Sequence, residues 1–429
     1  MTRRSQTAAT VPPGRDAVVV RDNSASPRQG WLRNIGRGAP RLLLGHSMLI
    51  SASLFTGGAA VLDYGGSSGL SRATNQVGWL VLVAGCVWFF VRSGRSNELV
   101  QDTALKWAFL GVFASQLLSS VFAGQLLSVN VFLPPLLATV MMCSHQILSW
   151  DAAVRALQLA TMLPVVASLA AFATGQSWAV GDSSRRIPAP FITGRLNGVI
   201  GHPNGLAPIA AMALLLTVFR PSRFRMPLAL LAGWVLLATD TRTMIIGAPV
   251  AIVVAVLERR RPVGGTRVLG LATTLGVGAF LLLAPGPLGS IFGGRDLETL
   301  NGRTVVWAEA VRYWHTSPWV GVGANAFDRG YRLRTGLTYA GQAHNQFLQT
   351  LAGEGALGLA VLVAACFAIV RRSIRKRSVT NGVSVGIAVL FLFNLFTESP
   401  LRVGRWSPGL LTLAVLLFVC STPTSKVRA

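Results

Sequence analysis

Residues 301–327 read NGRTVVWAEAVRYWHTSPWVGVGANAF, and residues 343–359 read AHNQFLQTLAGEGALGL. The first stretch is basic and rich in tryptophan. The second stretch enters a long apolar run through a single His-Asn pair, His344 and Asn345. Apolar runs flank the whole segment on both sides. The sequence therefore places a histidine and several arginines at the rim of a group of membrane-like segments.

Composition points to the same class of protein. The 429 residues are 52% hydrophobic and only 13% charged, whereas a soluble globular chain carries about 25% charged residues. Apolar runs of about 17–25 residues, the length of a membrane-spanning helix, recur along the chain. We therefore predict an all-α fold, a polytopic membrane helical bundle with about 12 spans.

The predicted spans are bounded by the polar and basic gaps in the sequence. They lie near 42–62, 76–92, 104–122, 126–144, 153–173, 204–219, 225–240, 242–257, 267–285, 346–370, 382–398 and 405–420. Residues 225–257 could also form one re-entrant unit.

The net charge of +24 comes from 39 basic and 15 acidic residues. Basic residues concentrate in alternate gaps between apolar runs, which is the positive-inside pattern of an inner-membrane protein rather than the basic face of a nucleic-acid-binding protein. Residues 1–41 are predicted to be a disordered basic cytoplasmic tail, 42–420 the transmembrane domain and 421–429 a second cytoplasmic tail. Residues 286–345 then form a long loop on the outer face.

The outer loop is expected to contain an interfacial helix. Five apolar residues share one face of it, at positions i, i+1, i+4, i+5 and i+8: Val306, Trp307, Ala310, Val311 and Trp314. The other face carries Arg303, Glu309 and Arg312. Aromatic side chains on such a helix favour the level of the lipid headgroups.

His344 is the candidate general base. An unperturbed imidazole titrates near pH 6.5, so it can accept a proton from a hydroxyl group near neutral pH. The adjacent helix start disfavours a second proton on the ring, and no acidic residue lies close to it in sequence. The alternative interpretation is that His344 only caps or packs against the helix.

Three arginines near the predicted membrane surface are candidates for anion binding: Arg195, Arg242 and Arg303. Arginine close to a bilayer is costly unless it is paired or functional, and neither Arg242 nor Arg303 has an obvious acidic partner in sequence. Guanidinium groups bind diphosphates through bidentate hydrogen bonds. The alternative is that these side chains snorkel to the headgroups.

Other polar residues carry weaker signals. His202 in GHPNG is typical of a turn, and the glycines of GVGANAF indicate a tight turn rather than a nucleotide loop. Glu398 and Arg402 flank an ESPLR turn and can pair with each other. The four cysteines lie in apolar runs as small hydrophobes, and no residue spacing is typical of a metal site, so we expect neither metal nor cofactor.

These residues together resemble the O-antigen ligase and O-antigen polymerase superfamily of membrane glycosyltransferases. The match rests on R-x-x-x-W-x-x-A, S-P-W-V-G-V-G-x-N-x-F and A-H-N-x-F-L-Q-x-L-A-x-E-G-x-L-G. The residues that carry it are Arg303, Trp307, Pro318, Gly321, Gly323, His344, Asn345, Gln349, Glu354 and Gly355. GHPNG and the arginine of TDTRT also fit, although Thr241 stands where the family usually has serine. The specific part covers residues 195–355.

The resemblance implies a C-type glycosyltransferase bundle whose outer-face loop forms a lid. It implies transfer of a glycan from a polyprenyl diphosphate donor, such as undecaprenyl diphosphate, to a sugar hydroxyl of a glycan acceptor at the outer face of the membrane. The reaction would invert the anomeric centre and need no metal. His344 would match the essential histidine and Arg195, Arg242 and Arg303 the diphosphate-binding arginines. Asn345, Glu398 and Arg402 are possible supporting residues.

Two functional questions stay open at the level of sequence. A transporter or flippase of lipid-linked glycans is the alternative class, but such proteins usually carry an acidic residue near the bilayer midplane and paired repeats. Polymerase, lipid-A-core ligase and protein O-glycan ligase differ in their acceptors, and the sequence shows no recognisable acceptor module. The absence of a signal for a terminal acceptor favours a polymerase or a related exopolysaccharide enzyme.

Overall fold

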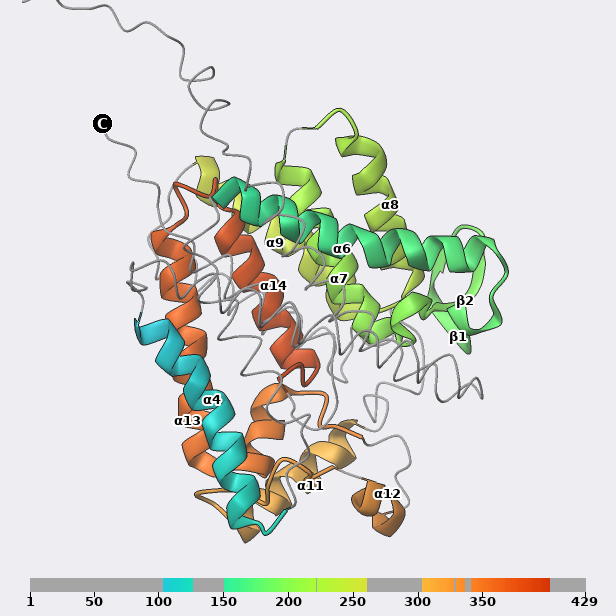
Figure 1. Cartoon of the computed structure of the whole chain (residues 1–429). Coiled ribbons are helices and arrows are strands. Elements are labelled where there is room, and N and C mark those ends of the chain that lie inside the picture. The colour runs from blue at the N-terminus through green and yellow to red at the C-terminus, as the bar shows by residue number, and fades with distance from the viewer. Residues whose placement is uncertain are drawn as a thin grey trace, which may run out of the picture. The chain divides into compact units, whose positions relative to one another are not determined.

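The computed structural model describes residues 103–125, 150–220, 222–260, 303–327, 329–335 and 341–401. These residues are predominantly helical, as predicted (Figure 1). The helices are α4 (Thr103–Phe122), α6 (Trp150–Ala173), α7 (Pro203–Phe219), α8 (Arg225–Ala238), α9 (Arg242–Arg260), α11 (Arg303–Thr316), α12 (Arg329–Thr335), α13 (Gln346–Arg375) and α14 (Val383–Thr397). Short 3₁₀ turns occupy Ser177–Ala179 and Gly198–Ile200.

Several predictions concern residues outside these ranges. They are the two terminal tails, the spans near 42–62, 76–92, 126–144, 267–285 and 405–420, residues 286–302 of the outer loop, and Arg402.

The described helices coincide with seven of the predicted spans, from 104–122 to 382–398. Among the described residues, only α13 is both long and apolar enough to cross a membrane by length and composition. Shorter apolar helices lie at Leu110–Phe122, Leu157–Ala173, Pro203–Phe219, Arg225–Ala238 and Val383–Thr397. The count of about 12 spans therefore stays a prediction. Residues 225–257 form two helices, α8 and α9, joined by a short turn, and the alternative of one re-entrant unit stays a prediction.

One small sheet was not expected. Strands β1 (Val180–Ala189) and β2 (Ile192–Leu196) pair antiparallel, with Gly181 opposite Arg195 and Ala189 opposite Ile192. The hairpin contacts α8. Its first strand reads VGDSSRRIPA, a polar stretch without the alternating apolar pattern that identifies a half-buried strand from sequence.

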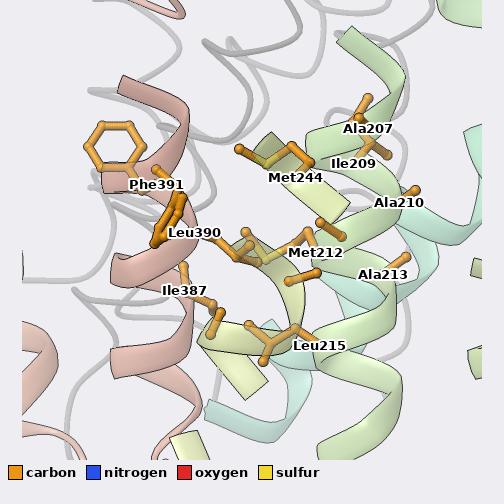
Figure 2. Close-up of a cluster of buried hydrophobic side chains, with 14 of the residues drawn as sticks. Ala207, Ile209, Ala210, Met212, Ala213, Leu215, Met244, Ile387, Leu390 and Phe391 are labelled. Carbon is orange, nitrogen blue, oxygen red and sulfur yellow. The ribbon is translucent and has the colours of Figure 1, made fainter. Parts of the chain in front are cut away.

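The main core lies where α7, α9 and α14 pack together (Figure 2). Alanines on α7 and α9, among them Ala210 and Ala251, are fully buried and let the backbones approach closely. Gly386 of α14 faces Ala251 of α9. A Cβ on Gly386 would lie 2.9 Å from the Ala251 carbonyl oxygen. Such small-residue contacts are typical of helices that associate within a membrane, where van der Waals packing rather than water exclusion holds them together.

Helix α13 is interrupted at Gly355, whose φ of 69° and ψ of −165° are not helical. The interruption frees backbone groups on both sides, and buried backbone groups need hydrogen-bond partners. The segment Pro318–Gly323 supplies them. Ala356 N donates to Pro318 O at 2.8 Å, and Leu357 N donates to Trp319 O at 3.2 Å.

The same segment also uses the carbonyl groups before the break. Val322 N donates to Ala352 O at 3.0 Å, and Gly323 N donates to Gly353 O at 2.8 Å. The GVG sequence is therefore a turn, as expected. Its role in this structure is to brace the N-terminal part of α13, which begins next to His344.

We predict that Gly355→Ala destabilises the protein. The new Cβ would lie 2.3 Å from the Trp319 carbonyl carbon, and the positive φ of 69° disfavours a side chain. Overpacking and backbone strain together should cost roughly 3 kcal/mol. Thermal unfolding of the detergent-purified protein measures the effect. The control is Gly233→Ala on α8, where a Cβ meets nothing within 4 Å and stability should be unchanged or slightly higher. Equal melting temperatures for the two variants would contradict the bracing role.

Candidate active site

Four helix ends converge on one carboxylate. Glu398 directly follows α14, Arg303 begins α11, Asn204 lies in the first turn of α7, and His344 lies two residues before α13. A helix end presents side chains from a fixed backbone. The site is therefore built on the ends of rigid elements, although its residues are up to 194 positions apart in sequence.

Both oxygens of Glu398 have two partners each. Asn204 Nδ2 donates to Oε1 at 2.7 Å, and Arg303 Nη2 lies 3.3 Å from the same oxygen. Gln342 Nε2 donates to Oε2 at 2.8 Å, and His344 Nδ1 lies 3.0 Å from it. Burial raises the pKa of Glu398, but the attraction of His344 and Arg303 outweighs it and brings the pKa to about 2. The carboxylate is therefore ionised at neutral pH.

The geometry around His344 favours one tautomer. A carboxylate only accepts hydrogen bonds, so Nδ1 carries a proton when it bonds to Glu398 Oε2. Gln342 Nε2 is also a donor, so its 3.2 Å approach to Nδ1 is then a contact and not a hydrogen bond. In the neutral ring, Nε2 is left as the basic nitrogen. The ring thus has one nitrogen fixed and the other able to take a proton.

The backbone at His344 is strained and held from both sides. Its φ is 49°, in the left-handed region that non-glycine residues rarely adopt. Trp307 Nε1 of α11 donates to Ala343 O at 2.8 Å, and Ala343 N donates to Gln349 Oε1 of α13 at 2.9 Å. The loop before α13 is therefore fixed where the candidate base needs a defined position.

Asn345, and not His344, caps α13. Asn345 has extended backbone angles, and its side chain accepts a hydrogen bond from Leu348 N at 3.1 Å. This is the arrangement of an N-cap residue. The alternative interpretation of His344 as the helix cap is therefore wrong, while the predicted helix start at this point is confirmed.

Arg195 lies beside the turn that joins α8 to α9. From strand β2, its Nε donates to Thr239 O at 3.1 Å and its Nη2 donates to Asn204 Oδ1 at 3.0 Å. The same turn is held by the hairpin, because Ile187 N donates to Asp240 Oδ1 at 3.0 Å. Asp240 has a φ of 52°. The unexpected hairpin thus positions both Arg195 and the turn that precedes Arg242.

Arg242 begins α9 on the other side of that turn, and its Nη2 atom is buried. The preceding residue, Thr241, donates its hydroxyl to Asn204 Oδ1 at 3.3 Å. Asn204 therefore contacts Arg195, Thr241 and Glu398. The structure brings His344, Arg303 and Glu398 into direct contact, and Arg195 joins them through Asn204.

One expectation about charge pairing is corrected. Arg303 was expected to lack an acidic partner, but it pairs with Glu398. Sequence distance hid this contact, since Arg303 and Glu398 are 95 positions apart. The pair of Glu398 with Arg402 stays a prediction, because Arg402 lies outside the described residues.

The face of α11 is partly as predicted. Val306 and Ala310 are buried, and Tyr313 packs against the same cluster with Phe327 and Tyr331. Val311 is exposed, so the buried face is rotated by part of a turn from the expected one. Glu309 and Arg312 pair on the outside of the helix, and the Arg312 hydrogen bond lowers the pKa of Glu309.

His202 has the local role expected for it and also lies close to the site. It is the N-cap of α7, with Nδ1 accepting a hydrogen bond from Asn204 N at 3.2 Å. Burial lowers the pKa of His202, and the nearby charges of Arg195 and His344 lower it further, against the opposing attraction of Glu398. A neutral His202 fits its role as an acceptor at the helix start.

Sequence reasoning missed Asn204, Gln342 and Thr241 as site residues. GHPNG was recognised as part of a family pattern but was interpreted as a turn, and Gln342 lies only two residues before the candidate base. The only feature of the sequence that pointed to these three residues was their position next to residues of the recognised motifs.

Comparison with known proteins gives a likeness to a known family for part of this site. A sequence model of the family described as O-antigen ligase matches residues 227–363, which include Arg242, Arg303 and His344. The matched residues do not include Asn204 or Glu398. Proteins of this family are membrane-integral. The predicted resemblance of the chain to the O-antigen ligase superfamily is thus confirmed.

A curated relative adds a second likeness for this chain. The exopolysaccharide production protein ExoQ of Rhizobium meliloti (strain 1021) is 29% identical over 203 residues, which are 41% of this chain and 46% of the relative. The chain therefore matches about half the length of this relative.

We predict that the Glu398 carboxylate stabilises the fold in a pH-dependent way. Because its pKa falls from 4.5 to about 2 on folding, its contribution is present above about pH 4.5 and is lost as the pH falls toward about 2. Thermal unfolding of the parent and of Glu398→Gln between pH 6 and about pH 3 tests this linkage. The parent should lose more stability over that interval than the variant. Parallel losses would contradict the assigned pairing.

Proposed function

We propose that this chain is a membrane glycosyltransferase of the O-antigen ligase type. It transfers a glycan from a polyprenyl diphosphate carrier to a sugar hydroxyl on the outer face of the cytoplasmic membrane, with inversion and without a metal. The observation that carries the proposal is the contact of His344 with Glu398. Arg303 pairs with the same carboxylate, and Arg195 is linked to it through Asn204. The proposal thus assigns His344 as the base, Glu398 as its partner and the neighbouring arginines as the anion site.

The arginines suit the leaving group. When the anomeric carbon separates from the diphosphate, negative charge grows on the departing oxygen, and guanidinium groups placed there stabilise it. Each guanidinium has five N–H donors, so Arg303 can contact Glu398 and still bind a phosphate oxygen. Arg195, Arg242 and Arg303 are the proposed diphosphate-binding residues. A diphosphate is already a good leaving group, so no acid catalyst is required on that side.

His344 suits the acceptor side. Its Nε2 would take the proton of the acceptor hydroxyl while that oxygen forms a bond to the anomeric carbon and the carbon–oxygen bond to the diphosphate breaks. Glu398 holds Nδ1 and offsets the positive charge that develops on the ring. Both Glu398 oxygens are occupied by hydrogen-bond and ionic partners, which argues against Glu398 as a nucleophile. A single displacement inverts the anomeric centre.

The proposed acceptor is the growing end of another glycan, which would make the chain a polymerase. The name of the relative, an exopolysaccharide production protein, supports this choice over a ligase with a terminal acceptor. The glycan profile of a deletion strain distinguishes the two. Accumulated lipid-linked single repeats indicate a polymerase, and intact polymer beside an unmodified acceptor indicates a ligase. A transporter of lipid-linked glycans would leave the isolated protein without any transferase activity.

We predict that His344→Ala abolishes detectable transfer while leaving the protein folded. A general base contributes about 10²–10⁴-fold in rate. The measurement is release of polyprenyl diphosphate from a lipid-linked oligosaccharide by the purified protein. Donor binding should be retained, because the arginines hold the diphosphate.

Two further variants test the anion site and provide a control. Arg242→Lys keeps the charge but loses the bidentate geometry, so it should weaken donor binding and activity together. Arg312→Ala removes an exposed arginine of α11 that pairs only locally with Glu309, and it should behave as the parent. Turnover by His344→Ala at a rate close to the parent would refute the base assignment.

We predict that α11 faces the outside of the cell and that the end of α13 faces the cytoplasm. Thr316 and Ser378 are exposed and suit labelling after replacement by cysteine. Cys86, Cys143, Cys366 and Cys420 are first replaced by alanine. A membrane-impermeant thiol reagent added to intact cells should label Thr316→Cys and spare Ser378→Cys until the membrane is opened. Equal labelling of the two in intact cells would overturn the topology and the outer-face site with it.

A further inference from the structure

Asn204 connects the arginine side of the site with the acid–base side. Its amide nitrogen donates to Glu398 Oε1 at 2.7 Å, and its amide oxygen accepts from Arg195 Nη2 at 3.0 Å and from Thr241 Oγ1 at 3.3 Å. These partners come from α14, β2 and the α8–α9 turn.

The orientation of the Asn204 amide is fixed by its neighbours. A guanidinium can only donate, so the atom facing Arg195 is the amide oxygen. A carboxylate can only accept, so the atom facing Glu398 is the amide nitrogen. A flipped amide would oppose donor to donor and acceptor to acceptor. Asparagine is the side chain of this length that carries both a donor and an acceptor, and aspartate would place two carboxylates 2.7 Å apart.

The backbone of Asn204 is equally constrained. The residue follows Pro203, the first residue of α7, and its N–H donates to the side chain of the N-cap His202. Proline at the first helical position restricts the conformation of the helix start. The amide therefore reaches Glu398 from a rigid element and holds Oε1, while Oε2 faces His344 Nδ1.

We propose that Asn204 is a positioning residue for the transfer reaction, which orients Glu398 toward His344 and ties that orientation to the Arg195 side of the anion site. This inference rests on the proposed function. Asn204 acts through Glu398 and not on the substrate itself. It should therefore affect the rate of the chemical step more than the binding of the donor.

A double-mutant cycle tests this action through Glu398. Asn204→Ala, Glu398→Gln and the double variant are compared by kcat and by KM for a polyprenyl-diphosphate-linked oligosaccharide. Asn204→Ala should lower kcat by roughly tenfold with little change in KM. In the Glu398→Gln background it should have almost no further effect, because residues that act as a unit are not additive.

The failures of the two proposals are distinguishable in this cycle. If Glu398→Gln has normal kcat, the acid–base pair of the proposed function is wrong. If Glu398→Gln is impaired but Asn204→Ala multiplies the loss in that background, the proposed function stands and the positioning role of Asn204 is wrong. Melting temperatures of all variants show whether any loss reflects unfolding instead.

Asn204→Leu guards against a variant that fails through lost packing, because leucine is close to asparagine in size. It removes the donor to Glu398 and the acceptor for Arg195 and Thr241.

The kcat of Asn204→Leu should therefore fall as for Asn204→Ala. A kcat equal to that of the parent in a variant that melts at the parent temperature would overturn the inference.

Discussion

The site depends on one buried carboxylate and the four partners that satisfy it. Removing a carboxylate from water costs several kcal/mol unless charges and hydrogen bonds replace the lost hydration. Glu398 obtains that replacement from Asn204, Arg303, Gln342 and His344. These residues belong to α7, α11 and the approach to α13, so a single electrostatic requirement holds together segments that are distant in the chain.

One carboxylate serves both sides of the site. Glu398 lies 3.0 Å from His344 Nδ1 and 3.3 Å from Arg303 Nη2. Its negative charge offsets the charge of the Arg303 guanidinium, and its contact with Nδ1 fixes the orientation and the tautomer of the imidazole.

Backbone strain gathers in the same region. His344 and Asp240 both have positive φ values, 49° and 52°, in the loops that carry the candidate base and precede Arg242. Such conformations cost of order 1–3 kcal/mol and persist when their surroundings fix them. The hydrogen bond from Trp307 to the loop before His344 and the hairpin contact to Asp240 do so here. The break at Gly355 has a comparable brace in Pro318–Gly323, so this part of the family pattern is structural in origin.

The sequence by itself determined the helical class, the ends of most described helices and the residues worth testing. Apolar runs and caps are local signals, and they located α7 and the start of α13 within one or two residues. Only the tertiary structure decided which of those residues meet. It paired Arg303 with Glu398, gave His344 its acidic partner and placed Asn204 between Arg195 and Glu398. The hairpin also came from tertiary context, since β1 lacks an alternating pattern. His344 and Glu398 are 54 positions apart, and Asn204 and Glu398 are 194 positions apart. Such contacts produce no periodic pattern in the sequence, because they depend on how the helices pack and not on local conformational preference.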